Sequence, residues 1–168
     1  MTRPDDVEIT RGRAELLDAV RPLWLALRTH HGEIAPELGP IRGDEDSWRR
    51  RRAQYTAWLA EERNFLLLAR RRGRALGYAF ARVADHSSPT WDGERTVLDL
   101  ETLSVLPEAR GGGVGARLIA LVREEAELRG YDRLTLTAVA ANRDALRFYE
   151  REGFEPMFVI LRDSRRRP

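Results

Sequence analysis

The segment Arg110-Gly111-Gly112-Gly113-Val114-Gly115-Ala116 joins a predicted strand to a predicted helix. The strand, residues 97–105, is apolar on both faces, as the central strand of a sheet should be. Glycines let a backbone approach a ligand closely, and the free N–H groups at the start of a helix attract anions. The segment therefore predicts a nest of N–H groups for a diphosphate, to which Arg110 would add charge-assisted contacts. A glycine turn that binds nothing is the alternative.

Two better-known phosphate loops do not match this segment. A Walker loop ends in Gly-Lys followed by Ser or Thr, whereas here Gly115 is followed by Ala116-Arg117. The dinucleotide fingerprint requires an acidic residue on the next strand, and the strand predicted from Leu134 ends in Ala138-Val139. The sequence therefore argues against both of these nucleotide-binding loops.

The rest of the chain supplies predicted strands and helices on both sides of the glycine segment. Before it, the apolar spacing predicts a strand at 7–10 and a helix at 13–31 that kinks or divides at Pro22. A loop at 32–43 leads to a second helix, which Asp44, Asp46 or Ser47 would cap. Hairpin strands at 65–69 and 75–83 and a loop at 86–94 follow. After it, the pattern predicts a helix that ends at Gly130, a strand at 134–139, a helix that runs from its cap Asn142 to Glu150 and is closed by Gly153, and a last strand at 157–161. Strands dominate early and a βαβα order follows, so the predicted fold class is α/β with a mixed sheet.

Composition narrows the class of protein. The 168 residues are 42% hydrophobic and 33% charged, the balance of a soluble globular chain long enough for one domain. The absence of cysteine excludes disulfides, thiolate metal sites and a cysteine nucleophile. No apolar run approaches the roughly 18 residues of a membrane span, and residues 1–10 lack the apolar core of a signal peptide, so a cytoplasmic protein without membrane contact is expected. All 29 basic residues are arginine, but a net charge of +2 gives no reason to expect a nucleic-acid partner.

A second block of residues follows the glycine segment after one helix and one strand. It consists of Asn142, then Ala145-Leu146-Arg147-Phe148-Tyr149-Glu150, then Gly153-Phe154. Together the two blocks resemble the GNAT superfamily, the GCN5-related N-acetyltransferases. The acyl-CoA signature of that family, Arg/Gln-x-x-Gly-x-Gly/Ala, falls here on Arg110, Gly113 and Gly115.

The resemblance covers residues 98–161 and implies a single domain, 1–168, whose mixed, splayed sheet is flanked by helices. It divides the chain into an acceptor-side half at 2–96, an acyl-CoA-binding half at 97–162 and a basic tail at 163–168. After Gly153 the chain is short for the last two strands of the family.

The resemblance also implies an acetyl-CoA-dependent N-acetyltransferase that uses no metal. A primary amine of a small molecule or peptide would attack the thioester directly in a ternary complex. The pantetheine arm of acetyl-CoA would pair with a strand backbone like an added strand, and the N–H of Val105 would face the thioester oxygen. The residues implied to bind acetyl-CoA are Leu103, Val105, Arg110, Gly111, Gly112, Gly113, Val114, Gly115, Ala116 and Asn142.

Tyr149 stands where the family carries its general acid. A free tyrosine has a pKa of ~10 and a thiol a pKa of ~8.5, so full proton transfer to the leaving thiolate is uphill by ~1.5 units, about 2 kcal/mol. Tyr149 would therefore stabilise the thiolate as it forms, without having to complete the transfer. A core tyrosine beside Leu146 and Phe148 is the alternative.

Glu101 is the predicted general base. An amine is mostly protonated at neutral pH, so a carboxylate or histidine must take its proton, directly or through water. The strand from Leu134 carries Thr137 rather than an acid, whereas the two-residue period of a strand places Glu101 on the face of Leu103 and Val105. An ion pair with an arginine is the alternative explanation for a charge in a central strand.

Other functions stay open. The missing acid at Thr137 fits a non-catalytic acyl-CoA-binding or regulatory module, and the same fold would also serve a longer acyl donor such as succinyl-CoA. The acceptor cannot be read from the sequence. Homodimers are common among similar proteins, so the oligomeric state is open as well.

Overall fold

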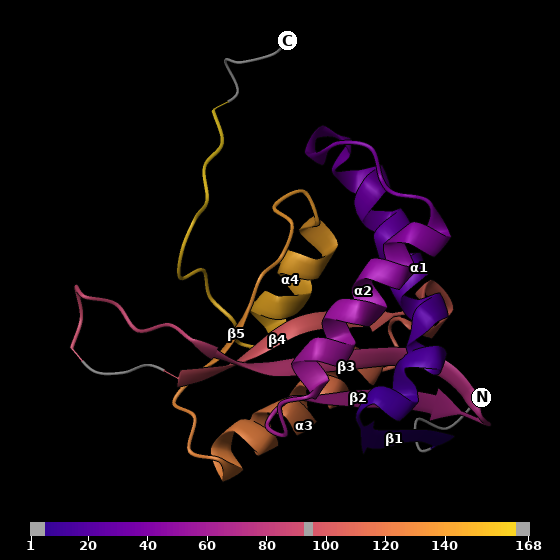
Figure 1. The fold of residues 1–168 in the computed structure, drawn as a ribbon, viewed down its shortest axis with the longest axis horizontal. Helices are drawn as coiled ribbons and strands as arrows, with labels where there is room; N and C mark the ends of the chain where they lie inside the picture. The colour runs from indigo at the N-terminus through magenta and orange to yellow at the C-terminus, as the bar shows by residue number, and fades with distance from the viewer. Residues whose placement is uncertain (1–5, 93–95, 164–168) are drawn as a thin grey trace.

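Five strands form one open sheet in the order β1-β2-β3-β4-β5 (Figure 1). The computed structural model describes residues 6–92 and 96–163. The strands are β1 (Val7–Gly12), β2 (Phe65–Arg71), β3 (Arg74–Asp85), β4 (Thr96–Val105) and β5 (Leu134–Leu136). The α-helices are α1 (Leu17–Ile34), α2 (Asp44–Leu59), α3 (Val114–Leu128) and α4 (Arg143–Arg151). Neighbouring strands are antiparallel except β4 and β5, which are parallel, so the predicted α/β fold with a mixed sheet is confirmed.

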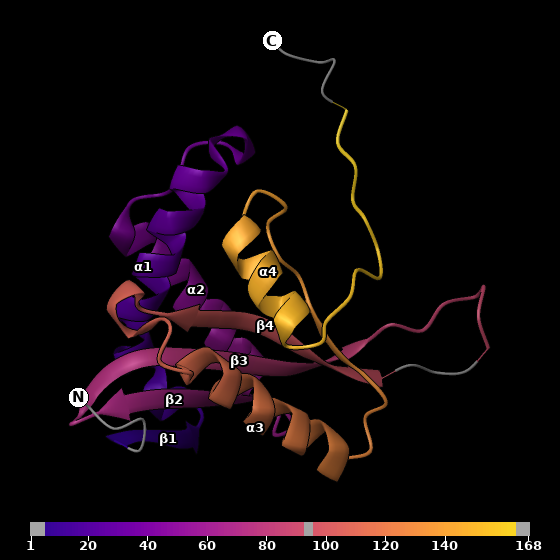
Figure 2. The same ribbon diagram turned by 180° about the vertical axis from the view of Figure 1, so that it is seen from behind.

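Helices cover both faces of the sheet (Figures 1 and 2). The helices α1 and α2 pack on one face, where Leu23, Tyr55 and Phe80 are fully buried. On the other face α3 packs against β4, and Leu98 and Ile119 are fully buried there. Because it is covered on both faces, β4 is the central strand that its apolar pattern predicted.

The parallel strands β4 and β5 stay together for three residues and then separate. Their pairing begins at Leu98 with Leu134 and ends at Leu100 with Leu136. The chain then turns to start α4, and the N–H of Asn142 donates to the carbonyl of Val139 at 2.8 Å. The prediction of a strand over 134–139 is therefore wrong in length, because its second half forms the approach to α4. Beyond Leu100 the β5 side of β4 has no paired strand among the described residues.

Two predictions about the first helices are corrected. The helix α1 does not divide at Pro22; the break comes earlier, where a 3-10 turn at Ala14–Leu16 precedes α1. Pro22 is exposed, so the backbone bond that it cannot donate is lost on the solvent side. The N-cap of α2 is Gly43, whereas Asp44, Asp46 and Ser47, the residues predicted as caps, lie inside the helix. Asp44 and Asp46 are in its first turn, where the positive end of the helix dipole favours their negative charge.

The end of the chain also differs from its prediction. Residues 157–161 are not a strand: they are extended, unpaired and exposed (Figure 1). The predicted loop at 86–94 connects β3 to β4, holds an isolated bridge between Ser88 and Trp91, and lies partly outside the described residues. The basic residues at 165–167 also lie outside them. Within the described residues, no helix is long and apolar enough to cross a membrane.

Candidate functional site

The glycine segment forms the sharp turn that begins α3. Gly111 and Gly113 have φ angles of 75° and 76°, in the left-handed region that glycine adopts without strain. Gly113 is the helix cap and offers no side-chain bond, and the first backbone bond of the helix runs from Arg117 N–H to the Gly113 carbonyl at 3.0 Å. The N–H groups of the first helical turn therefore have no acceptor among the described residues. This arrangement fits the anion nest that the sequence predicted.

The free edge of β4 leads into this turn. Leu106 N–H donates to the Leu76 carbonyl of β3 at 2.9 Å, so the preceding residue opposite Gly77 is a non-hydrogen-bonded position of the antiparallel pair. The N–H and C=O groups of Val105, and of Leu103 two residues before it, therefore point away from β3, toward the gap left by β5. Arg110 Nε donates to the Val105 carbonyl at 3.1 Å. The N–H of Val105 and the backbone groups of Leu103 thus lie, together with the nest, at one end of the sheet.

A cavity of about 410 Å³ opens between α1 and this end of β4. Its walls include Thr29, His30 and Glu33 of α1, together with Val105 and Arg110. It brings polar groups of the first half of the chain next to residues predicted to bind acetyl-CoA. A concave site with a few polar groups among apolar walls suits a small polar ligand.

Tyr149 lies on α4, half-buried at the edge of the core that includes α3. Its ring packs edge-on against Phe154 at 5.8 Å between centroids and tilted against Phe148 at 5.4 Å. Burial raises the pKa of Tyr149 to about 12. Its hydroxyl has no hydrogen-bond partner among the described residues. A neutral hydroxyl without a protein acceptor is available to donate to a ligand atom.

Gly115 serves the packing of α4 rather than an unusual backbone angle. A Cβ atom at this position would lie 3.1 Å from Cζ of Phe148. The missing side chain therefore lets α4 pack directly on the first turn of α3, so that the second predicted block is held against the nest.

Replacing Gly115 by valine should lower the free energy of unfolding by about 1–3 kcal/mol, because the three added carbons would overpack the contact with Phe148. Chemical denaturation of Gly115→Val measures the loss, with Ala120→Val at an exposed position of α3 as the control for helix propensity. Phe148→Ala should restore part of the lost stability when combined with Gly115→Val. Additive losses in the double variant would show that the two residues are not in contact.

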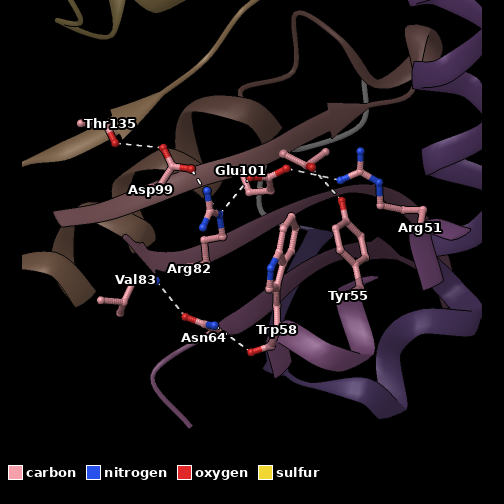
Figure 3. Close-up of polar contacts among 10 residues, drawn as sticks. Arg51, Tyr55, Trp58, Asn64, Arg82, Val83, Asp99, Glu101 and Thr135 are labelled. Carbon is pink, nitrogen blue, oxygen red and sulfur yellow. Dashed lines mark hydrogen bonds and ion pairs between the residues drawn. The ribbon is translucent and has the colours of Figure 1, made fainter. Parts of the chain in front are cut away.

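Glu101 is held between two arginines in the structure (Figure 3). Arg51 of α2 lies 3.3 Å from its Oε1, and Arg82 of β3 lies 3.0 Å from its Oε2. The prediction that Glu101 shares a face with Leu103 and Val105 is wrong. A bulge in β4 opposite Phe80 and Ala81 interrupts the alternation, so Glu101 points toward α2 while Leu103 and Val105 pack against the core on the α3 face.

Asp99, two residues before Glu101, belongs to the same charged cluster (Figure 3). It accepts a hydrogen bond from Thr135 of β5 at 2.9 Å and lies 3.6 Å from Arg82. Burial raises the pKa of Asp99, although the bond from Thr135 and the charge of Arg82 oppose the shift. The two carboxylates of β4 and the arginines of α2 and β3 therefore form a cluster with no net charge. The cluster lies where the parallel strands β4 and β5 separate.

Asn142 caps α4 as predicted. Its Oδ1 accepts from the Ala145 N–H at 3.2 Å, which leaves the side-chain NH₂ group without a partner among the described residues. Within residues 6–92 and 96–163, no three His, Asp or Glu side chains are grouped to hold a metal ion.

The structure adds three residues that the sequence reasoning missed: Arg51, Arg82 and Asp99. Arg51 stands in a run of four arginines at 49–52, and its guanidinium lies 4.0 Å from the ring centroid of Trp24. Asp99 carried a signal, because a second acid two residues from Glu101 in a central strand needs a partner. The partners themselves come from elements distant in sequence, which no local pattern identifies.

The comparisons with known proteins agree with this geometry. Residues 24–154 match the acetyltransferase (GNAT) family. The aminoalkylphosphonate N-acetyltransferase of Salmonella typhimurium is 36% identical over 89 residues, which cover 52% of this chain and 54% of that protein. The mycothiol acetyltransferase of Salinispora tropica is 31% identical over 155 residues, which cover 90% of this chain and 45% of that protein. This chain therefore spans about half the length of the curated relatives it matches.

A solved structure extends the likeness to the whole fold. The aminoglycoside N-acetyltransferase AAC(6')-Iy in complex with CoA superimposes with a TM-score of 0.70 over 98% of this chain and 99% of its own. At 23% identity this likeness concerns the fold alone. The family match, in contrast, covers both blocks and most of the chain around them. The chain therefore belongs to the GNAT family of acetyltransferases.

Proposed function

We propose that this protein is an acetyl-CoA-dependent N-acetyltransferase that acts on a primary amine of a small molecule or peptide. The observation that carries the proposal is that N–H groups at the start of α3 lie at the same end of the sheet as the edge of β4 beyond Leu100, and neither has a partner among the described residues. The first suits the diphosphate of CoA, and the second suits the amide groups of its pantetheine arm. The names of the relatives, an aminoalkylphosphonate and a mycothiol acetyltransferase, support an amine-bearing small molecule as acceptor.

The residues divide the work of binding and chemistry. The N–H groups of residues 111–116 and Arg110 would hold the diphosphate, and Asn142 would bond the arm through its free NH₂ group. Leu103 and Val105 would pair with the arm, with Val105 N–H directed at the thioester oxygen. The half at 97–162 would thus bind acetyl-CoA, while the half at 2–96 would shape the acceptor site around the cavity beside α1.

The transfer itself needs a base for the amine proton and a hydrogen-bond donor for the leaving thiolate. The acceptor nitrogen attacks the thioester carbonyl carbon, so that a C–N bond forms, the C–S bond breaks and sulfur takes the electron pair. Tyr149 donates a hydrogen bond to that sulfur, and Glu101 receives the proton of the amine, directly or through water. No metal enters this scheme. A cytoplasmic location stays a prediction.

Measuring CoA release from acetyl-CoA with a panel of amines tests the proposal. The panel should contain an aminoalkylphosphonate, an amino sugar, a polyamine and a dipeptide, and succinyl-CoA should be run beside acetyl-CoA as the longer donor. Turnover with at least one amine and acetyl-CoA is expected. The second candidate, a non-catalytic acyl-CoA-binding module, is favoured by the double ion pair of Glu101, and tight acetyl-CoA binding without turnover on a broad panel would support it instead.

Glu101→Gln should lower kcat by about 100-fold, because the amide cannot accept the proton. Asp99→Asn is the matched control, since it removes the other carboxylate beside Arg82. Turnover rates and thermal unfolding measured for both variants distinguish the roles. An equal loss of rate in both variants would mean that the cluster only holds the structure together.

A further inference from the structure

The turn between β2 and β3 is built from arginines. Arg71 ends β2 and pairs with Arg74 at the start of β3, so that Arg72 and Gly73 alone form the turn. Both turn residues have positive φ angles, 49° at Arg72 and 77° at Gly73. Two-residue turns of this kind favour Asn or Asp before the glycine, because longer side chains are strained at positive φ. An arginine at the strained position has to be explained by what its side chain does.

A cavity of about 400 Å³, which we call the arginine cavity, opens beside this turn. Its walls carry three guanidinium groups and one carboxylate, and the residues that line it are Arg71, Arg72, Arg74, Leu76, Glu108 and Ala109. Glu108 lies 2.5 Å from Arg74, so its charge is already neutralised. Arg72 reaches Asp6 only at 4.0 Å, and the side chain of Arg72 is 82% exposed. The arginine cavity therefore has an excess of positive charge.

Arg71 has a polar group without an acceptor. The residue is half-buried, and its Nε atom is buried and has no hydrogen-bond partner within residues 6–92 and 96–163. A buried N–H without an acceptor costs free energy, and the cost is larger when the group is charged. An anionic oxygen in the arginine cavity would supply the missing acceptor.

The arginine cavity is separate from the proposed acetyl-CoA site. The 3-10 turn Pro107–Ala109 runs between the two, since Pro107 lines the cavity beside α1, whereas Glu108 and Ala109 line the arginine cavity. None of the nest residues 111–116 lines the arginine cavity. A concave site of this volume suits a small molecule, whereas an extended polyanion needs an open charged surface.

We infer that the arginine cavity is a second anion site, which binds the phosphate monoester of a small molecule. A phosphate monoester carries nearly two negative charges and three strong acceptor oxygens, so it can bond several guanidinium groups at once. A single carboxylate would balance one charge and is already present in Glu108. The phosphate can come from two sources, the 3′-phosphate of a CoA molecule bound at the nest or a separate phosphorylated molecule. The inference goes beyond the proposed function and requires no catalytic activity.

A nuclear magnetic resonance titration of the full chain with inorganic phosphate tests the inference. Ionic strength is held constant with sodium chloride, and saturable shifts are expected at the backbone amides of Gly73 and Leu76, with a Kd of about 1–10 mM for so small a ligand. Arg71→Gln and Arg74→Gln should each weaken this binding by at least about 10-fold. The side chain of Arg74 is 65% exposed, so its variant keeps the test valid if Arg71→Gln does not fold.

Arg70→Gln is the matched control. Arg70 precedes Arg71 on β2 and does not line the arginine cavity, because adjacent strand residues point to opposite faces. The control loses the same charge and should bind phosphate within about twofold of the wild type, since salt screens a charge on the far face. No saturable shift at the turn, or an equal loss in Arg70→Gln, overturns the inference. Shifts at Gly73 that disappear in Gly113→Glu overturn it as well, because they would place the phosphate at the nest.

Calorimetry with CoA and 3′-dephospho-CoA identifies the source of the phosphate. A 3′-phosphate in the arginine cavity predicts that CoA binds at least about 10-fold more tightly than dephospho-CoA and that Arg74→Gln removes the difference. A separate phosphorylated molecule predicts equal affinities and a phosphate titration that saturating CoA leaves unchanged. Either result supports the site. A failure of CoA to bind would count against the proposed function alone, because the phosphate titration measures the arginine cavity without CoA.

Discussion

Replacing Gly113 by glutamate should weaken acetyl-CoA binding by at least about 100-fold, which corresponds to the loss of one or two charge-assisted hydrogen bonds. Gly113 is exposed, has a φ angle of 76° and caps α3. A side chain there is strained by the left-handed backbone, and its Cβ would lie in open space at the start of α3. A carboxylate at that point would repel the diphosphate as well as displace it.

Gly73 provides a matched control for this prediction. It lies in the exposed turn between β2 and β3 with a φ angle of 77° and, like Gly113, has no atom within 4 Å of a built Cβ. Gly73→Glu should therefore lose a similar amount of stability in thermal unfolding while it binds acetyl-CoA as the wild type does. Isothermal titration of both variants makes the comparison. Equal affinities in the two variants would show that the turn at Gly113 is not the anion site.

Tyr149→Phe should lower kcat by about 100-fold while the Kd for acetyl-CoA changes by no more than about twofold. The phenol pKa of about 12 lies well above the ~8.5 of a thiol, so complete proton transfer from Tyr149 is more strongly uphill than for a free tyrosine. The contribution expected of the hydroxyl is a hydrogen bond that strengthens as charge develops on sulfur. Such a bond affects the rate and leaves ground-state binding nearly unchanged.

The pKa of Tyr149 also determines how the reaction rate should depend on pH. A raised pKa keeps the phenol neutral at every pH below about 12, so no fall in rate up to pH 10 should come from its ionisation. Tyr131→Phe, which removes a hydroxyl from another half-buried tyrosine beyond the far end of α3, is the control and should leave kcat unchanged. An unchanged rate in Tyr149→Phe would remove Tyr149 from the mechanism and favour its role as a packing residue beside Phe148 and Phe154.

The parts of this protein that local sequence predicts well are those decided by a few neighbouring residues. The glycine turn, the cap at Asn142 and the strand–helix order around them depend on backbone angles and helix ends, which short motifs encode. The burial of β4 on both faces followed in the same way from its composition. These features place the proposed binding groups at one end of the sheet.

The features that the sequence could not predict depend on the register between strands and on side-chain partners that are distant in sequence. The bulge at Glu101 turns its side chain from the expected face toward α2, because strand alternation holds only while the pairing with β3 is regular. Arg51 and Arg82 reach Glu101 from α2 and β3, 50 and 19 residues away in sequence. The end of β5 at Leu136 was missed because the separation of the parallel strands begins where the turn toward Asn142 begins, and no apolar pattern marks that point.

Calorimetric titration of the full chain with CoA and, separately, with pantetheine tests the central claim most directly, because the two ligands share the arm and differ by the nucleotide and its phosphates. The account predicts that CoA binds with a measurable exothermic signal and at least about 100-fold more tightly than pantetheine, with the difference lost in Gly113→Glu. No heat with CoA, or equal affinities for the two ligands, would contradict the claim that the turn before α3 holds the diphosphate.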